Sequence, residues 1–596
     1  MDIKDKIDDL EQAGNDEIKL YEKRELRHEY REQKDHLKQE YREHMRYGDG
    51  GYRQEHREQR VLLKRDYKEQ KRKIEELREA AMMNVMGRFR NNISGIIRIL
   101  VAMLLVGGQF ALILSLPVFL HQYTIYFYLI LEVFSFLLAL ALTNANKSAS
   151  YKVAWMSIAL LFPISGHIMY YMWGRTKPRK RIVESAIHKI AETYPYLTED
   201  VDTREELYRE IPEAKRMSKY MSAEHFPLYK NNRTKYYPRG EQVFKDMFED
   251  MLDAKKFILV NFFIVAEGAI WDMMHEIMQI KVSEGVEVIF IYDDFGAMLR
   301  TEQDMADRLN REGIKTMVFN PIRRYTDKLI MNYRSHEKIV VIDGEVGYTG
   351  GFNLADEYAN LIPRFGVWKD CGIRVEGDAV WGLTVTFMQM WSMCRPDERI
   401  PYLDYKTDKR VEDNNSFCHV ISDGPTGKSV HFLERVYKQM IADADEKLYI
   451  MTPYLILEDH MVQSLVEAVK RGVDVRIITP NIPDKKSVKL LTEYNYGPLL
   501  EAGVRIYEYT PGFIHSKVIM NEFAGIVGTV NMDYRSFYLH YENAVWLTDR
   551  DTLKTIEDDF LQTFDISAGI TYEKWLDRPF SVKVKQIVLN LFATMV

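Results

Sequence analysis

Cysteine is scarce in this sequence, with three residues in 596: Cys371, Cys394 and Cys418. Three cysteines cannot build a disulfide framework, and the absence of any Cys-x-x-Cys spacing argues against a structural zinc site. A dominant charge is also lacking, because 81 basic and 88 acidic residues leave a net charge of −7. That balance is not the electrostatic footprint of a nucleic-acid-binding protein. Residues 1–80 hold no apolar run, so we expect no cleavable signal peptide.

The composition excludes a collagen-like or wholly disordered chain, since 46% of the residues are hydrophobic and 28% are charged. The length predicts about four structural units. A mean hydropathy of −0.31 is typical of a soluble protein, but this average hides strong local differences. These differences predict an arm over 1–90, a membrane anchor over 91–181, and two lobes over 182–405 and 406–596.

About half of the residues in 1–90 are charged, and the few apolar ones follow heptad-like steps. Gly48-Asp49-Gly50-Gly51 is a strong turn signal between two such runs. We therefore predict two charged helices that fold as a hairpin or are joined by a flexible break. Two interpretations stay open: a solvated helical arm held by ion pairs, or a coiled coil for self-association or partner binding.

Three apolar segments follow, over 99–120, 123–143 and 153–174. The first two are long enough to span a bilayer. The third contains Pro163 and Gly166, and we expect it to be re-entrant or interfacial because three full spans conflict with the distribution of basic residues. Glu132 in the second segment is either a functional intramembrane acid or the partner of a neighbouring helix. We expect a multi-pass protein of the cell membrane with its lobes on the cytoplasmic side, where the basic run 175–181 faces anionic lipids.

Residues 182–596 alternate short apolar strands with amphipathic helices, as α/β units do. It also repeats itself: residues 253–263 resemble 443–454, 284–293 resemble 471–480, and 335–343 resemble 514–522. The sequence therefore predicts two homologous α/β sandwich lobes.

Each half of this repeat carries a His-x-Lys motif with an acid and an asparagine at similar offsets. The first set is His336, Lys338, Asp343 and Asn353, and the second is His515, Lys517, Glu522 and Asn531. Two histidines can divide a phosphoryl transfer between a nucleophile and a general acid, while lysines and asparagines bind the phosphoryl oxygens. The acids are not clustered as ligands, so we expect neither a metal nor another cofactor.

These motifs, with YDDFG (292–296), YTPGFIHSK (509–517) and NMDYRSF (531–537), resemble the phospholipase D superfamily and, within it, the bacterial cardiolipin synthases. The resemblance implies two tandem phospholipase D-type α/β sandwich lobes with a pseudo-twofold shared site, preceded by transmembrane helices. The N-terminal charged helical arm is predicted from the residue pattern alone and has no counterpart in the typical synthase.

It further implies that His336 is the nucleophile and His515 the general acid and base. Asp370 and Glu542 match the family's carboxylates that hydrogen-bond the imidazoles. We place Asp343 and Glu522 with the catalytic set, although the motif acid of the family is usually a structural partner beneath the site. The second copy departs from the family's pattern: Glu522 replaces the usual Asp, Thr529 a common Ser, and the interval to Asn531 is one residue shorter.

The resemblance implies that two phosphatidylglycerol molecules give cardiolipin and glycerol through a phosphohistidine. A phospholipase D, or a transferase with another acceptor alcohol, would share the same residues. A nuclease is opposed by the net acidity and the anchor, and an inactive membrane scaffold by the intact motifs. We expect phosphatidylglycerol, other anionic lipids and the bilayer as partners, no nucleic acid, and self-association through the arm.

Overall fold

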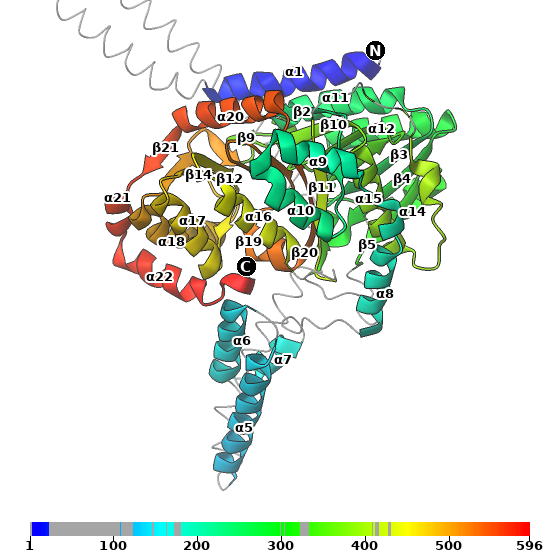
Figure 1. Ribbon diagram of the computed structural model, residues 1–596. Coiled ribbons are helices and arrows are strands. Elements are labelled where there is room, and N and C mark those ends of the chain that lie inside the picture. The colour runs from blue at the N-terminus through cyan, green and yellow to red at the C-terminus, as the bar shows by residue number, and fades with distance from the viewer. Residues whose placement is uncertain are drawn as a thin grey trace, which may run out of the picture.

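The computed structural model describes residues 3–22, 108, 123–145, 148–162, 164–171, 180–298, 300–302, 304–321, 333–407, 409, 411, 416–426 and 431–595. Two α/β lobes pack side by side, with a helical hairpin projecting from one end (Figure 1). Most of the predicted arm, all of the predicted span 99–120 except residue 108, and most of the basic run 175–181 lie outside the described residues.

The first lobe is built on a seven-stranded sheet in the order β2-β10-β8-β7-β3-β4-β5. Strands β3, β4 and β5 are parallel, and the strands from β7 outward are antiparallel. The apolar runs predicted as strands are buried on both faces, which is why they read as continuous rather than alternating. The strands are β2 (Asn232–Tyr237), β3 (Phe257–Phe262), β4 (Glu287–Asp293), β5 (Lys315–Phe319), β7 (Ile339–Ile342), β8 (Val346–Gly350) and β10 (Gly372–Gly377), and the helices are α11 (Gly240–Asp253), α12 (Ala269–Ser283), α13 (Asp294–Ala297), α14 (Met305–Arg311), η4 (Asp356–Ala359) and α15 (Val380–Cys394).

The second lobe repeats this order: β11-β20-β18-β17-β12-β14-β15 matches β2-β10-β8-β7-β3-β4-β5, with β1 and β21 added at the two edges. The repeat predicted from sequence is thus a repeat of topology. The strands are β11 (Cys418–Asp423), β12 (Lys447–Met451), β13 (Leu455–Ile456), β14 (Asp474–Pro480), β15 (Arg505–Tyr509), β17 (Val518–Met520), β18 (Gly525–Gly528), β19 (Met532–Asp533), β20 (His540–Leu547) and β21 (Ser567–Ile570), and the helices are α16 (Phe432–Asp443), α17 (Asp459–Lys470), α18 (Lys486–Ala502), α19 (Tyr534–Tyr538), α20 (Arg550–Asp565), α21 (Tyr572–Leu576), α22 (Phe580–Asn590) and η6 (Ala593–Met595).

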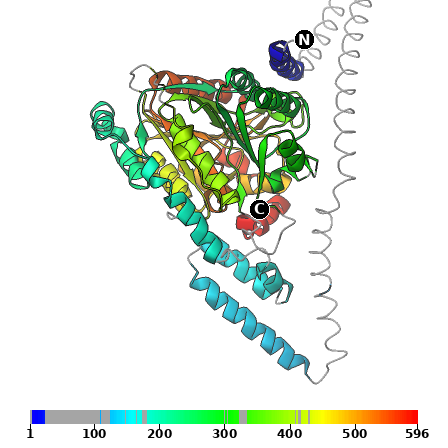
Figure 2. The same ribbon diagram turned by 90° about the vertical axis from the view of Figure 1, so that its right-hand side faces the viewer.

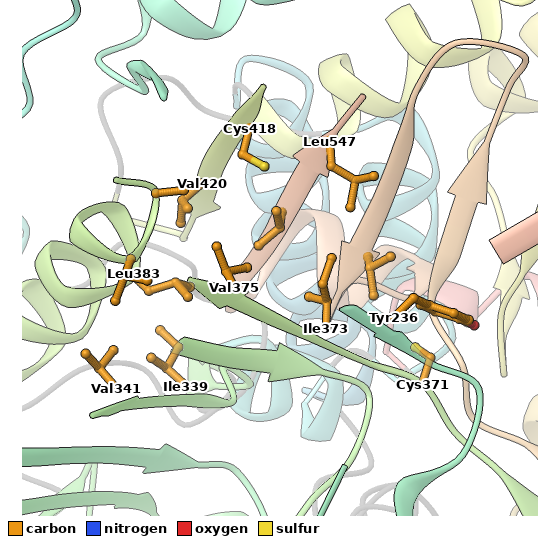
Figure 3. Close-up of a cluster of buried hydrophobic side chains, with 14 of the residues drawn as sticks. Tyr236, Ile339, Val341, Cys371, Ile373, Val375, Leu383, Cys418, Val420 and Leu547 are labelled. Carbon is orange, nitrogen blue, oxygen red and sulfur yellow. The ribbon is translucent and has the colours of Figure 1, made fainter. Parts of the chain in front are cut away.

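The antiparallel halves of the two sheets face each other across a shared apolar core (Figure 3). Ile373 and Val375 of β10 lie there with Val420 of β11 and Leu547 of β20. A core common to both lobes fixes their relative position, because interiors pack at crystal-like density and tolerate little sliding. The interface is therefore rigid enough to hold a site made by residues of both lobes.

The segment before the first sheet packs on the second lobe. Leu207, Met217 and Met221 are buried in its core, and β1 (Leu228–Tyr229) pairs with β11. The limits predicted for the four domains stay a prediction, but in space residues 201–229 join the second lobe. This segment and its surroundings contain α8 (Lys180–Ala191), η2 (Tyr194–Tyr196), α9 (Val201–Glu210), η3 (Pro212–Ala214), α10 (Lys215–Ala223) and η5 (Tyr402–Tyr405).

The described part of the predicted arm is one helix, α1 (Ile3–Glu22), which lies along α11 of the first lobe (Figure 1). Ile7 is buried against that lobe, and Lys245 of α11 pairs with Asp8 and Glu11 at 2.7 and 3.0 Å. These residues are therefore docked on their own chain rather than solvated on all sides. Self-association through the arm stays a prediction.

The projecting hairpin consists of α5 (Thr124–Thr143) and α6 (Ala149–Leu161), followed by the short α7 (Ser165–Met169). Within the described residues, one helix is long and apolar enough to cross a membrane: Ile125–Thr143, of mean hydropathy 2.3. The third apolar segment is interrupted between Leu161 and Ser165, where the sequence predicts a break. The number of spans and their orientation stay predictions.

Candidate active site

His336 follows a two-residue strand, β6 (Arg334–Ser335), which pairs with β20 of the other lobe. Its backbone N–H donates to the carbonyl of Tyr541 at 2.8 Å. Asp293, the first Asp of the YDDFG sequence, accepts from the Ser335 N–H at 2.9 Å and faces the Arg334 guanidinium at 3.4 Å. The second lobe and the end of β4 thus fix the strand that carries His336.

His515 is held in the same way with the lobes exchanged. It follows β16 (Gly512–Ile514), which pairs with β9 (Val367–Lys369) of the first lobe. Its N–H donates to the carbonyl of Lys369 at 2.7 Å. Each histidine therefore stands on a short strand that the opposite lobe completes.

The carboxylate partners also cross the interface. Nδ1 of His336 lies 2.8 Å from Glu542 of the second lobe, and Nδ1 of His515 lies 2.8 Å from Asp370 of the first. Both carboxylates are fully buried. Because each Nδ1 is engaged, the Nε2 atom of each imidazole is left for chemistry. The two lobes form one site, and neither lobe contains a complete histidine–carboxylate pair.

The Asp370 carboxylate lies directly against the backbone at Gly351, where the lack of a side chain leaves room for it. A Cβ added at Gly351 would lie 2.0 Å from an oxygen of that carboxylate and 2.9 Å from the His515 carbonyl oxygen. Any side chain there would displace the group that orients His515. The glycine that follows β8 is thus required by the site.

The two lysines are buried and turned back toward the histidines. Nζ of Lys338 donates to the His336 carbonyl at 2.6 Å, and Nζ of Lys517 donates to that of His515. Burial lowers the pKa of Lys338 to about 7 and that of Lys517 to about 8. A bound phosphate would stabilise both ammonium groups, since an opposite charge favours the charged form.

The asparagines of the two motifs are buried beside the strands β8 and β18. Oδ1 of Asn353 accepts from the Ile264 N–H at 3.0 Å. Its Nδ2 has no acceptor among the described residues, and Oδ1 of Asn531 has no donor there. Unpaired buried amide atoms are costly. The Asn353 amide can donate to a phosphoryl oxygen, whereas the free Asn531 oxygen can accept from a hydroxyl of a ligand.

Burial and Lys338 lower the pKa of His336 well below its usual value, and burial and Lys517 lower that of His515 to about 4. Both imidazoles are therefore neutral at pH 7. The pKa values of the two carboxylates are shifted in opposite directions. Burial raises the pKa of Glu542 well above its usual value, whereas at Asp370 the His515 ring and Lys517 outweigh burial and lower the pKa. The pseudo-symmetric site is thus electrostatically asymmetric.

Asp343 and Glu522 do not lie with the histidines, and the prediction that places them in the catalytic set is corrected. Asp343 accepts from the N–H groups of Lys255, Lys256 and Phe257 at 2.7, 2.7 and 2.9 Å. Glu522 binds the equivalent amides before β12 at 3.0 to 3.5 Å. Each acid stands at the far end of β7 or β17 from its histidine, where it satisfies backbone donors at the start of the neighbouring strand.

We expect Asp343→Ala to lower the free energy of unfolding by about 2 kcal/mol, because one buried and two part-buried N–H groups lose a carboxylate acceptor. Glu522→Ala should cost about 1 kcal/mol, since its bonds are longer and more exposed. Denaturant unfolding and turnover per folded molecule would be measured for both variants. A lost kcat in a variant of unchanged stability would restore the catalytic assignment.

His540 is a further histidine that motif reasoning missed. Its ring lies 5.3 Å from that of His336, and its Nδ1 lies 3.5 Å from Glu542. Among the described residues, His336, His540 and Glu542 form a group whose ligand atoms lie within 4.8 Å of one another. Burial lowers the pKa of both histidines, and the charge of Lys338 lowers it further. The same charge opposes a cation. A metal-free reaction stays a prediction.

Two His-x-Lys motifs, brought together at the interface of duplicated α/β lobes and oriented by crossed carboxylates, define a phosphodiester-transfer site of the phospholipase D class. Residues 247–361 and 437–564 match the family model described as cardiolipin synthase, PLD-like domain. Residues 125–175 match a second one, phospholipase D-nuclease N-terminal. The matched ranges contain both histidines and both lysines.

Known proteins agree with this class. The chain is 38% identical over 460 residues to an uncharacterized protein of Streptococcus mutans, covering 76% of this chain and 99% of the relative. It is 31% identical over 468 residues to a cardiolipin synthase of Geobacillus kaustophilus, covering 77% and 91%. The crystal structure of a phosphatidylserine synthase from Haemophilus influenzae aligns with a TM-score of 0.50 at 16% identity, over 64% of this chain and all of that one, and shares the fold. The chain belongs to the cardiolipin synthase family of phospholipase D-like phosphatidyltransferases.

Proposed function

We propose that the protein makes cardiolipin and glycerol from two phosphatidylglycerol molecules through a phosphohistidine. The observation that carries the proposal is the pair of imidazoles, each oriented through Nδ1 by a carboxylate of the opposite lobe. The family supplies the lipid substrate class. Two lysines and two asparagines beside the histidines suit an anionic phosphodiester.

In the first step, Nε2 of His336 attacks phosphorus as the bond to the headgroup glycerol breaks. His515, which takes up a proton on Nε2 as the phosphodiester anion binds, gives that proton to the departing glycerol oxygen. Free glycerol leaves, and the phosphatidyl group stays on His336. In the second step, His515 takes the proton from the terminal hydroxyl of another phosphatidylglycerol. That oxygen bonds to phosphorus, the P–N bond breaks, and cardiolipin and neutral His336 result.

The asymmetry of the carboxylates supports this division of roles. A nucleophile must be neutral, and burial together with the charge of Lys338 lowers the pKa of His336 well below its usual value. A general acid must be protonated before it acts, and His515 faces the ionised Asp370. An arriving phosphodiester anion adds to the charge that favours imidazolium at His515. His515 is therefore the better acid and His336 the better nucleophile.

The same proposal places the protein's reaction at a membrane. The helix Ile125–Thr143 is expected to cross the bilayer as part of a multi-pass anchor, with the lobes on the cytoplasmic side. Tyr151 and Trp155 of α6 pack with Tyr534 of α19, three residues after Asn531. The anchor thus rests directly on the segment between two site residues, which supports a site close to the lipids.

Product analysis tests the reaction. The full chain in vesicles of phosphatidylglycerol labelled in the headgroup should release one of every two labelled glycerols and retain the other in cardiolipin. The His336→Ala protein in identical vesicles is the matched control. Phosphatidic acid as the main product would identify a hydrolase, and exchange of the headgroup for another alcohol would identify a different transferase. Either result would overturn the proposed acceptor.

The lysine pKa values predict the alkaline limb of the pH profile of kcat/KM. Both ammonium groups must be charged to hold a phosphodiester, and their charge is lost as pH rises through about 7 at Lys338 and about 8 at Lys517. We therefore expect kcat/KM to fall above about pH 7. In Lys338→Arg the limb should move toward the pKa of Lys517, because guanidinium stays charged. Each pH profile would be scaled to its own maximum, and superimposable limbs would contradict the role of Lys338.

A further inference from the structure

The helix α22 presents its apolar side outward. Four large apolar residues share one side of the helix, at the spacing of successive helical turns. Their exposed fractions are 81% for Phe580, 42% for Val584, 61% for Ile587 and 54% for Val588. Gln586 is the buried residue of this helix. A helix on the surface of a soluble body has the reverse arrangement, with the apolar stripe inward.

The unusual orientation is fixed by contacts on the inner side. Arg578 donates to Gln586 at 3.0 Å, and Gln586 donates to Glu493 of α18 at 3.4 Å. Leu589 and Ala593 pack against Ile456, Val488 and Leu491 of the second lobe. The helix cannot turn its apolar stripe inward without breaking these contacts, so the stripe is held outward.

The position of α22 identifies what covers the stripe. It lies at the end of the body from which α5 and α6 project, in both views (Figures 1 and 2). The chain after it reaches α6, and Phe592 packs against the apolar cluster that contains Trp155. Leu160 and Leu161 of α6 are more than half exposed, as are many apolar residues of α5. The outward stripe of α22 therefore continues the apolar surface of the anchor.

The charges around the stripe also suit a surface that contacts a membrane. The helix contains no acidic residue, and Lys583 and Lys585 lie between its apolar positions. In the segment before it, Lys574 and Arg578 are balanced by Glu573 and Asp577, so the net positive charge beside the stripe comes from the two lysines of the helix itself. An apolar stripe flanked by lysines is the pattern of a helix that lies in the headgroup layer of a membrane with anionic lipids.

We propose that α22 is an interfacial helix, embedded along its length in the headgroup layer of the leaflet that α5 enters. It gives the body a second membrane contact beside the anchor. Two contacts fix the tilt of the body, and with it the height of the Tyr534 segment over the leaflet. This placement does not depend on the reaction proposed above.

Depth-dependent quenching tests the placement in the full chain. Cys371 and Cys418 are buried, so a Cys394→Ser background leaves an introduced cysteine as the reactive thiol. Ile587→Cys would carry an environment-sensitive fluorophore in proteoliposomes with phosphatidylglycerol. Nitroxide near the lipid headgroup should quench it strongly, and nitroxide deep in the acyl chains weakly. The matched control is Leu561→Cys on α20, an exposed apolar residue at the opposite end of the body.

Equal quenching at positions 587 and 561 would overturn the proposal. So would a probe at 587 that no lipid quencher reaches, because another segment of this chain would then cover the stripe. In a second measurement, Phe580→Ser with Ile587→Ser should lower turnover of vesicle phosphatidylglycerol about tenfold and leave that of a monomeric short-chain analogue unchanged. This measurement rests on the proposed function: if neither substrate reacts in the parent, the reaction has failed and the quenching result stands.

Discussion

Replacing His336 by alanine is expected to lower turnover of phosphatidylglycerol by about 10⁴-fold or more, because the atom that bonds to phosphorus is removed. His515→Ala should lose a similar factor with this substrate, since glycerol leaves poorly without a proton. The double variant should be no worse than either single one, because the two residues act as a unit.

A substrate with a good leaving group separates the two roles. A phosphatidyl ester of p-nitrophenol needs no general acid, because p-nitrophenolate leaves unprotonated. His515→Ala should therefore release one equivalent of p-nitrophenol in a burst and keep the phosphatidyl group on the protein. His336→Ala should show neither the burst nor the label.

The matched control is His275→Gln, which removes a histidine paired with Glu312 outside the site and should keep the parental turnover. Thermal unfolding of each variant would show that the fold is intact. A burst in His336→Ala and none in His515→Ala would exchange the roles. Near-parental turnover of either alanine variant with phosphatidylglycerol would refute a shared site.

The lobes and their histidines could be predicted because duplication leaves a trace in sequence. Both copies place an apolar strand, a glycine turn and a His-x-Lys at corresponding positions, and the two sheets repeat one strand order. The strands carry the signal because burial on both faces demands apolar residues throughout. The fold class and the role of Asp370 and Glu542 as partners of the imidazoles follow from that trace and the family pattern. That each carboxylate binds the histidine of the opposite lobe is known only from the structure.

The remainder depends on contacts between segments that are distant in sequence. The motif places Asp343 close to His336 in sequence, but the four-residue strand β7 separates the two in space. The carboxylate of Asp343 instead binds backbone N–H groups at the start of β3, a contact that the motif does not reveal. His540 enters the site through the pairing of β20 with β6. The docking of α1 on α11 and the outward stripe of α22 are also tertiary facts, because periodicity defines a helix face and not its neighbour.

Asp370→Asn and Glu542→Gln are each expected to lower turnover of phosphatidylglycerol by about 10³- to 10⁴-fold, close to the loss when the buried Asp of a Ser-His-Asp triad is made Asn. An amide can donate to Nδ1, which moves the ring proton to Nε2. At His336 this blocks the nucleophilic lone pair. At His515 it removes the charge that supports imidazolium.

The two losses should differ in kind. Glu542→Gln should abolish the p-nitrophenol burst, because it disables attack by His336. Asp370→Asn should keep the burst and fail in the second step, since a good leaving group bypasses the acid but the acceptor hydroxyl still needs His515 as base. Asp250→Asn, which weakens a pair with Arg374 on the first lobe, is the control and should retain both activities. If Asp370→Asn also lost the burst, the carboxylates would support both histidines equally, and the electrostatic asymmetry of the site would have no part in the division of roles.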